Sequence, residues 1–242
     1  MTLAPLRYDP PTEPRLVIIH EDRDMVVLNK PGGLLSVPGR TPELFDSALT
    51  RVRETHPGAQ AVHRLDLGTS GVLVVATRRK AESELRRQFQ ERLTRKVYLA
   101  RVEGSVAQDE GVVDLPLVCD WPNRPRQMVC RATGKPALTE YRVLERDERT
   151  TLVLLLPHTG RSHQLRVHMA SLGHPIVGDN LYGPDADADP AGLLLHASQL
   201  GLFHPFSGQW TVFHAPCAFA PGVPPFPLTQ PSADQSAYQE NR

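Results

Sequence analysis

The sequence has few cysteines and no long hydrophobic run. Its 242 residues include three cysteines, Cys119, Cys130 and Cys217. Because an odd number at these spacings fits neither a disulfide framework nor a paired zinc knuckle, we interpret them as reduced thiols of a cytoplasmic protein. No apolar run approaches the roughly 20 residues that cross a bilayer, and prolines interrupt the start of the chain where a signal peptide needs an apolar core. These absences exclude a membrane-spanning or disulfide-rich secreted protein.

Common metal and cofactor motifs are absent as well. The sequence contains no glycine-rich phosphate loop and no nucleophile elbow. His158, His163 and His168 recur every five residues, which turns each about 140° around a helix from the last, so they do not share a face as metal ligands would. The acidic run 185–189 begins like a calcium loop, but proline occupies the position where that loop requires glycine. We therefore expect no bound metal and no cofactor.

Charge is balanced overall but unevenly distributed. The chain carries 27 Lys and Arg against 27 Asp and Glu. Between Arg78 and Arg101, however, nine basic residues stand against three acids, and between Asp120 and Lys135 four stand against one. Such local excess is typical of a surface that neutralises phosphates, and it also occurs on a solvated helix face. The pattern alone does not choose between them.

Composition divides the chain into a central body and two polar ends. The first 14 residues hold four prolines, and the last 22 are rich in Pro, Ser and Gln. We therefore predict a Pro-rich leader at 1–14, one folded domain at 15–220 and a flexible tail at 221–242.

Apolar patterning predicts more strands than helices. Strands are expected at 16–19, 25–28, 71–76, 97–102, 138–144, 151–156, 193–202 and 210–214, and the polar run 21–24 should join the first two as a hairpin. Apolar residues four apart predict an amphipathic helix over 80–92, and a second helix is expected over 163–172. Because strands and helices rarely alternate, we predict an α+β fold in which a few helices flank a mixed, largely antiparallel sheet.

The run His63-Arg64-Leu65-Asp66 carries the first candidate for chemistry. It is similar to the catalytic loop of protein kinases, but no glycine-rich loop precedes it and no Asp-Phe-Gly follows. A polar loop at 67–71 and an apolar strand at 72–76 follow instead, which places Asp66 on a loop held by a buried scaffold. An Asp before such a loop is more often a turn residue, so the run by itself is weak evidence for function.

Three separated segments strengthen this evidence because together they resemble one enzyme family. The segment 62–77, the tripeptide Lys96-Val97-Tyr98 and the segment 159–168 occur in the order and spacing of the RluA family of pseudouridine synthases, and the resemblance continues through 173–179. It extends more loosely over almost the whole body. The resemblance implies the pseudouridine synthase catalytic fold and an isomerisation that moves uracil from an N1 to a C5 linkage with ribose.

Other segments are most similar to the member after which the family is named. They are Asn29-Lys30-Pro31, 34–40 and 120–127. This similarity implies specific uridines in structured RNA as substrates, in the anticodon stem-loop of tRNA and in a hairpin of 23S ribosomal RNA of the large subunit. Only about 15 residues precede the first expected strand, so the RNA-binding module that many relatives carry there is expected to be absent.

The resemblance assigns the reaction to Asp66. The isomerisation is redox-neutral and needs neither a hydride carrier nor a metal, but it needs a nucleophile or base beside the sugar, which a carboxylate can supply. The sequence leaves open whether Asp66 attacks the base, attacks the sugar or removes a ribose proton. His63 and His168 are interpreted as structural hydrogen-bonding partners rather than proton carriers.

The remaining site residues follow from the same motifs. Arg166 matches the family position whose guanidinium faces the catalytic carboxylate, and Tyr98 matches the aromatic residue that stacks on the target base. Because the uridine must leave its stack, we expect Arg64 to fill the gap and Arg161 to bind the RNA backbone. Outside the motifs, Arg166 would be read as a surface arginine and Tyr98 as a core residue.

Two rival functions remain. The first is a noncatalytic RNA-binding or chaperone protein of the same fold, against which the intact Asp66, Tyr98 and Arg166 argue. The second is a hydrolase of the glycosidic bond, for which paired carboxylates are expected and no convincing second acid is found. We therefore predict a cofactor-free RNA-modifying enzyme that acts as a monomer in the cytoplasm, with tRNA and large-subunit ribosomal RNA as partners and no membrane.

Overall fold

The computed structural model describes residues 8–184 and 192–231, which contain one large sheet, a separate two-stranded hairpin and three α-helices. The acidic run 185–189 and the end of the predicted tail lie outside these ranges. The helices are α1 (Ala48–Arg53), α2 (Arg79–Gln90) and α3 (Gln164–Ser171), with short 3-10 turns η1 (Pro42–Leu44) and η2 (Trp121–Asn123). The strands are β1 (Ile18–Glu21), β2 (Met25–Lys30), β3 (Gln60–Ala61), β4 (Ser70–Ala76), β5 (Arg95–Glu103), β6 (Glu110–Asp114), β7 (Leu117–Cys119), β8 (Gln127–Val129), β9 (Leu138–Arg146), β10 (Thr150–Pro157), β11 (Leu195–Phe203) and β12 (Trp210–His214).

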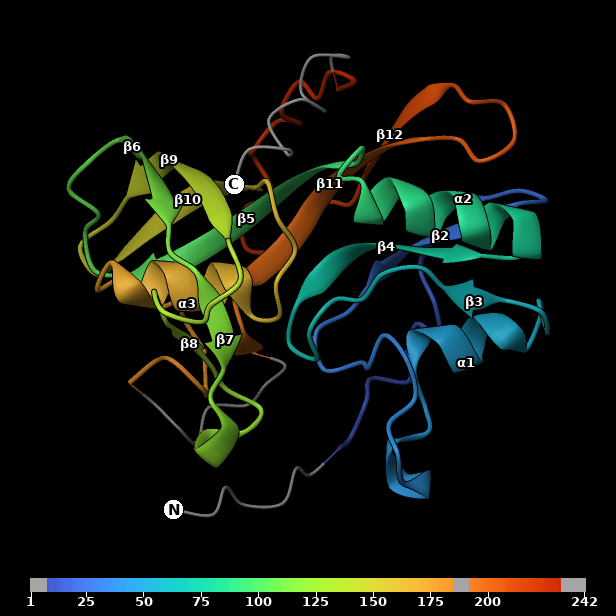
Figure 1. Cartoon of the computed structure of the whole chain (residues 1–242), viewed down its shortest axis with the longest axis horizontal. Helices are drawn as coiled ribbons and strands as arrows, with labels where there is room; N and C mark the ends of the chain where they lie inside the picture. Colours follow the sequence, from blue (N-terminus) through green and yellow to red (C-terminus); the bar gives the residue numbers. More distant parts are fainter. Residues whose placement is uncertain (1–7, 185–191, 232–242) are drawn as a thin grey trace.

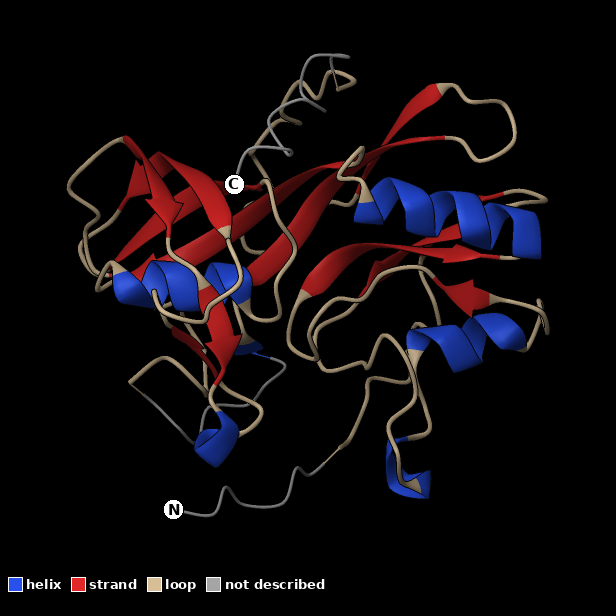
Figure 2. Ribbon diagram, viewed as in Figure 1, coloured by secondary structure: helices blue, strands red, loops and turns tan. Residues whose placement is uncertain are grey.

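The sheet is mixed and largely antiparallel. Its strands follow the order β1-β2-β4-β11-β5-β10-β9-β6, with β3 paired to β4 and β12 paired to β11, while β7 and β8 form a separate hairpin. Within the described residues only the β4–β11 pairing is parallel. Figure 2 shows the helices lying against the faces of this sheet. The predicted fold class is confirmed, and no helix of the described ranges is long and apolar enough to span a bilayer.

The strongly patterned elements were predicted well, whereas helix α1 and strands β3, β6, β7 and β8 were not. The hairpin of β1 and β2 forms across the expected polar turn, and the predicted helix 80–92 is observed as α2. Helix α1 has six residues, and strands β6, β7 and β8 have five, three and three, so no periodic signal of usable length marks them.

Side-chain alternation in β4 explains why helices cover both faces at this end of the sheet. Val72 and Val74 pack with Leu85 of α2, whereas Leu73 and Val75 pack with Val52 of α1. A strand buried on both faces reads as a continuous apolar run, as the sequence Val72 to Ala76 does. Figure 1 shows α2 and α1 on opposite sides of β4.

The other end of the sheet is also covered on both faces. Val153 and Leu155 of β10 pack with Leu165 of α3, whereas Leu152 and Leu154 face the C-terminal segment 217–228. In that segment Phe226 exchanges two hydrogen bonds with the side chain of Gln199. The packed body therefore continues past Ala220, the boundary suggested by composition, because apolar residues within the Pro-rich segment cover this face.

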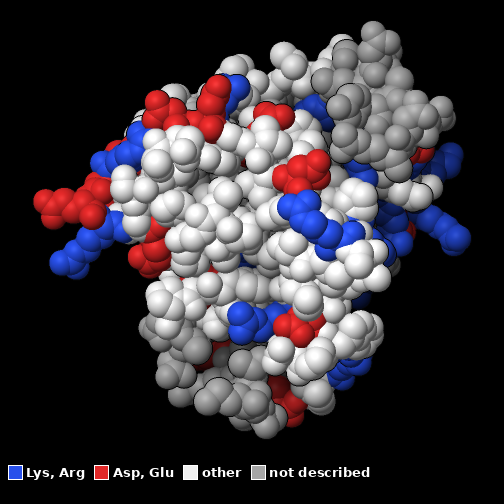
Figure 3. Space-filling view, turned by 60° about the vertical axis from the view of Figure 1, so that its left-hand side comes forward, with Lys and Arg blue, Asp and Glu red and all other residues white. Residues whose placement is uncertain are grey.

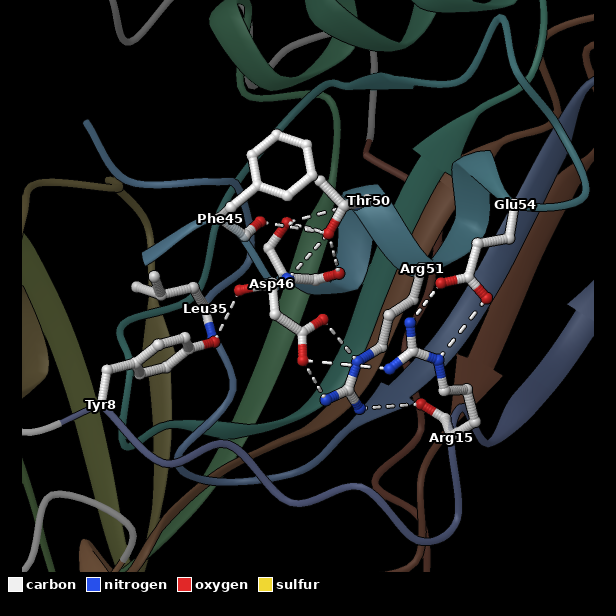
Figure 4. Close-up of polar contacts among 9 residues, drawn as sticks. Tyr8, Arg15, Leu35, Phe45, Asp46, Thr50, Arg51 and Glu54 are labelled. Carbon is white, nitrogen blue, oxygen red and sulfur yellow. Dashed lines mark hydrogen bonds and ion pairs between the residues drawn. The ribbon is translucent and has the colours of Figure 1, made fainter. Parts of the chain in front are cut away.

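Residues before β1 are also held against the body. Tyr8 Oη donates to the carbonyl of Asp46 at 2.7 Å and accepts the Leu35 amide at 3.1 Å. The Arg51 side chain is buried and donates two hydrogen bonds to the Asp46 carboxylate and one to the Arg15 carbonyl (Figure 4). Part of the predicted leader thus takes part in the hydrogen bonding that fixes α1 and the segment before it.

The parallel pairing of β4 with β11 joins the two ends of the sheet. Gly71 lies opposite Ala197 in this pairing and has a φ of +109°. A Cβ atom at Gly71 would lie 2.2 Å from the carbonyl oxygen of Ala197. Only glycine allows the backbones to approach this closely.

We predict that Gly71→Ala destabilises the protein by about 2–5 kcal/mol, because it combines a disfavoured φ with a backbone clash. Gly173→Ala is the matched control. Gly173 also has a positive φ, +84°, but a Cβ there would meet nothing within 4 Å. We expect it to cost only about 1–2 kcal/mol. Urea unfolding of both variants measures the difference, and equal losses would contradict a role for the close strand approach.

Candidate active site

A cavity of about 490 Å³ lies where the loop before β4, the start of β5 and the loop before α3 meet. This volume is in the range of pockets that hold small ligands. The structure brings together all five residues that the sequence proposed for the site, although three separate segments supply them. They are Arg64, Asp66, Tyr98, Arg161 and Arg166.

Hydrogen bonds to an upstream segment hold the loop that carries Asp66. Ser36 Oγ donates to the carbonyl of Leu65 at 2.8 Å and accepts the Leu65 amide at 3.0 Å. The Lys30 ammonium donates to the carbonyl of Leu67 at 3.3 Å. Both neighbours of Asp66 are therefore anchored, and the carboxylate projects from a loop with little freedom to move.

Lys30 is a component of the site that the sequence analysis missed. It is 1% exposed and also donates to the carbonyls of Pro31 and Leu34, at 2.8 and 2.7 Å. Burial lowers the pKa of the Lys30 ammonium to about 7, and the negative charge of Asp66 opposes this shift. The available signal was a lysine directly after the apolar run 25–28 and Asn29, because a lysine at the end of such a strand is buried only when its donors are satisfied.

Arg166, on α3, faces two carboxylates. Its Nη1 lies 3.7 Å from Asp66 Oδ2, while its Nε and Nη2 donate to the Asp179 carboxylate at 2.8 and 2.7 Å. The side chains of Arg166 and Asp179 are only 7% and 0% exposed. Burial disfavours the charged guanidinium, but the hydrogen bonds and charge of Asp179 outweigh it and raise the pKa of Arg166. The bidentate pair fixes a permanent cation beside Asp66.

His163 and Tyr182 complete the surroundings of Asp66. His163 precedes α3 in a left-handed conformation with φ of 53°, so the helix begins one residue later than predicted. Its Nε2 lies 3.9 Å from Asp66 Oδ1, and its Nδ1 lies 2.8 Å from Tyr182 Oη. Burial lowers the pKa of His163. Neither His163 nor Tyr182 was singled out for the site from the sequence, because only the fold brings them to Asp66.

The cavity lining is cationic around one acid. Among the described residues that line it, Asp66 is the sole carboxylate, so the structure shows no second acid of the kind that glycosidic hydrolases use. The Lys and Arg side chains of the lining are Arg64, Arg92, Lys96, Arg161 and Arg166. This charge distribution suits an anionic ligand that presents one reacting group to Asp66.

Tyr98 and Lys96 enter the cavity from β5. Burial raises the pKa of the Tyr98 hydroxyl, and the nearby Asp66 charge adds to the shift, so the phenol keeps its proton. Burial lowers the pKa of Lys96 to about 8, and the charges of Arg92 and Arg95 act in the same direction. The Lys96 ammonium donates to the carbonyl of Thr159 at 3.2 Å.

The arginines at the cavity rim and on α2 differ in their hydrogen-bond and ion-pair partners. Arg64 is exposed at the cavity rim, whereas Arg161 Nε donates to the carbonyl of Pro136 at 3.0 Å. On α2, Arg86 and Arg87 form ion pairs with glutamates of the same helix, at 2.9 and 2.8 Å. The face in Figure 3 likewise shows basic and acidic groups interspersed rather than one extended basic area. The basic excess on α2 is therefore partly neutralised within the helix.

The two motif histidines make the structural hydrogen bonds that were expected. His63 Nε2 accepts the amide N–H of Val74 at 2.9 Å, and its ring stacks on Phe89 at 4.4 Å. His168 lies 2.9 Å from Thr139 Oγ1 through Nδ1 and donates to a backbone carbonyl through Nε2. Burial, with a smaller contribution from Lys96, lowers the pKa of His63 to about 3.

Sequence comparisons agree with this geometry. The family model described as RNA pseudouridylate synthase matches residues 24–171. The chain is 56% identical over 214 residues to the dual-specificity RNA pseudouridine synthase RluA of Escherichia coli K12, which covers 88% of this chain and 98% of that protein. It is 53% identical over 225 residues to the protein of the same name from Vibrio parahaemolyticus, with 90% of each chain covered.

Solved structures show the same fold. Human RNA pseudouridylate synthase domain containing 1 superposes with a TM-score of 0.71 at 31% identity, covering 95% of this chain and 96% of the human one. Human RNA pseudouridylate synthase domain containing 4 gives a TM-score of 0.66 at 28% identity, covering 82% and 87%.

We predict that neutral His63 contributes to the stability of the fold in a pH-dependent way. Its folded pKa of about 3 lies below the ordinary value of 6.5. As pH falls from 6.5 toward 3, the unfolded chain binds a proton that the folded chain excludes, so this stability is lost at up to about 1.4 kcal/mol per pH unit. The stability advantage over His63→Gln should therefore shrink on acidification. Urea unfolding across this pH range measures it, and a constant difference would contradict the assignment.

Proposed function

Because the chain belongs to the RNA pseudouridylate synthase family, we propose that it isomerises specific uridines in tRNA and in large-subunit ribosomal RNA. The two bacterial relatives described above, which are 56% and 53% identical to this chain, are both named dual-specificity enzymes. The segments 29–31, 34–40 and 120–127, which resemble the founding member of the RluA family, support the anticodon stem-loop and a 23S hairpin as the two targets.

One observation carries the catalytic assignment. Asp66 is the sole acid among the described residues that line the cavity, and the guanidinium of Arg166 lies 3.7 Å from its carboxylate. Pseudouridine formation breaks the bond between N1 and C1′, turns the base and joins C5 to C1′, while a proton leaves C5 and N1 gains one. A fixed carboxylate can serve as the nucleophile or base of this sequence. A noncatalytic RNA-binding protein would not need this arrangement.

The neighbouring side chains fit a uridine turned out of its helix. The ring of Tyr98 lines the cavity beside Asp66, where it can stack on the base. Arg64 is exposed at the rim, where its planar guanidinium can occupy the space that the uridine leaves. Arg161 lies on the same lining and can contact the backbone of the RNA.

We also propose that one copy of the chain in the cytoplasm suffices for the reaction. The carboxylate, the guanidinium that faces it and the tyrosine of the site all come from the same chain.

Asp66→Asn is expected to abolish the reaction while leaving the fold intact. Because isomerisation must release hydrogen from C5, RNA labelled with tritium at uracil C5 reports it directly. We expect release from tRNA and ribosomal RNA transcripts to fall at least about a thousandfold, since the amide is neither nucleophile nor base. Asp9→Asn makes the same chemical change at an exposed position and should release tritium as the wild type does. Release that survives in Asp66→Asn would contradict the assignment.

Thr69 is predicted to contact the substrate. It is 2% exposed and lines the cavity, and its Oγ1 has no hydrogen-bond partner among the described residues. Because an unpaired buried hydroxyl costs about 1–3 kcal/mol, Thr69→Val should be as stable as the wild type or more so. If the substrate supplies the partner, kcat/KM should fall about tenfold.

The control for this prediction is Thr159→Val. Thr159 is also buried, but its Oγ1 donates to Gln164 and accepts the amide of Leu138. That variant should lose about 1–3 kcal/mol of stability. Urea unfolding and tritium-release kinetics separate the two cases. A stable Thr69→Val variant with full activity would show that the hydroxyl does not contact the substrate.

A further inference from the structure

The β7–β8 hairpin carries an exposed aromatic side chain outside the cavity. Figure 1 shows this hairpin extending away from the large sheet beside α3. Trp121, in the η2 turn at its tip, is 66% exposed. The guanidinium carbon of Arg124 lies 3.4 Å from the centroid of the Trp121 ring. The arginine thus covers one part of the indole and leaves most of the side chain open to solvent.

The segment 117–135, which contains this hairpin, carries four basic residues. Within the described part of the chain no carboxylate forms an ion pair with Arg124, Arg126, Arg131 or Lys135. Asp120, the one acid of the segment, accepts a hydrogen bond from the side chain of Asn123 at 3.0 Å. This contrasts with α2, where Arg86 and Arg87 are paired. A basic surface without partners attracts phosphates more strongly than a paired one.

The hairpin is coupled to the catalytic cavity along its strands. The amide of Gln127 donates to Tyr182 Oη at 2.7 Å, and the same hydroxyl contacts His163 beside Asp66. Leu117 and Val129 pack with Val167, which lies next to Arg166 on α3. These contacts hold the tip of the hairpin in place relative to Asp66. Binding of a ligand at the tip therefore costs the protein little conformational entropy.

We propose that Trp121 and Arg124 form a second RNA-binding site, where an unpaired base of the substrate stacks on the indole. The inference rests on the proposed function and adds to it a contact outside the cavity that takes the target uridine. Bases stack on aromatic rings and on guanidinium planes, and the neighbouring cations bind the adjacent phosphates. A stem-loop substrate presents unpaired bases near its target, whereas a continuous duplex does not.

Tryptophan fluorescence tests the stacking directly. The chain has two tryptophans, and Trp210 lies on β12 at the other end of the molecule from the hairpin (Figure 1). In Trp210→Phe, Trp121 is the single tryptophan, and an unmodified tRNA transcript should quench its emission on binding. In Trp121→Phe, the signal of Trp210 should stay constant. A fully paired RNA duplex of similar length should leave Trp121 unquenched; absent quenching with the transcript, or equal quenching with the duplex, would overturn the proposal.

Binding measurements test how much the contact contributes. Trp121→Ala should raise the Kd for the tRNA transcript about tenfold, and Trp121→Phe, which keeps an aromatic face, should raise it less. Arg124→Gln should reduce the slope of log Kd against log salt concentration by about 1, the value expected for the loss of one phosphate contact. In tritium-release assays these variants should show a higher KM. Because Trp121 is exposed, circular dichroism should confirm that these variants fold; unchanged Kd in folded Trp121→Ala would overturn the proposal.

The outcomes also separate this proposal from the proposed function. Tritium release by the wild type without quenching of Trp121 would leave the isomerase assignment standing and overturn the second site. Quenching without any tritium release would support the stacking site and overturn the assignment of the reaction.

Discussion

The site depends on the pairing of β4 with β11, the one parallel contact among the described strands of the large sheet. Asp66 lies in the loop that leads into β4, whereas Tyr98 and Arg166 belong to the other half of the molecule, on β5 and α3. Strand β11 pairs with both β4 and β5, so it sets the distance between the two halves. The close approach at Gly71 keeps that distance short. The carboxylate and its cation meet because two half-sheets are joined at this point.

Charge pairing then decides how Arg166 acts on Asp66. Asp179 takes the direct bidentate hydrogen bonds at 2.7 and 2.8 Å, and Asp66 stands at the longer distance of 3.7 Å. A buried guanidinium without a close partner would be costly, and Asp179 removes that cost without occupying the cavity. Asp66 therefore has a cation beside it and still keeps its oxygens available to a ligand. Ser36 and Lys30 fix the position of Asp66 in turn, because their hydrogen bonds anchor the loop that carries it.

The basic residues of the chain fall into different physical classes. On α2, Arg86 and Arg87 are paired within the helix. The basic residues of the cavity surround the one acid of its described lining, and those of the segment 117–135 have no described carboxylate partner. A count of charges along the sequence does not distinguish the basic residues of α2 from those of the segment that contains the β7–β8 hairpin. Only the positions of the carboxylates distinguish a solvated helix face from a surface that is free to bind phosphate.

The sequence by itself determined the fold class, the long strands, helix α2 and the five residues proposed for the site, because these depend on patterns or motifs within single segments. It did not determine helix α1, strands β3, β6, β7 and β8, or the covering of the sheet by residues 217–228. The apolar pattern in each of these segments is too short, or too interrupted by proline, to predict an element or a buried contact. Tertiary structure alone decided that Lys30, His163 and Asp179 support Asp66. Each lies in a segment that resembles the RluA family, but its contact with Asp66 or Arg166 depends on distances between segments that only the packing of the sheet establishes.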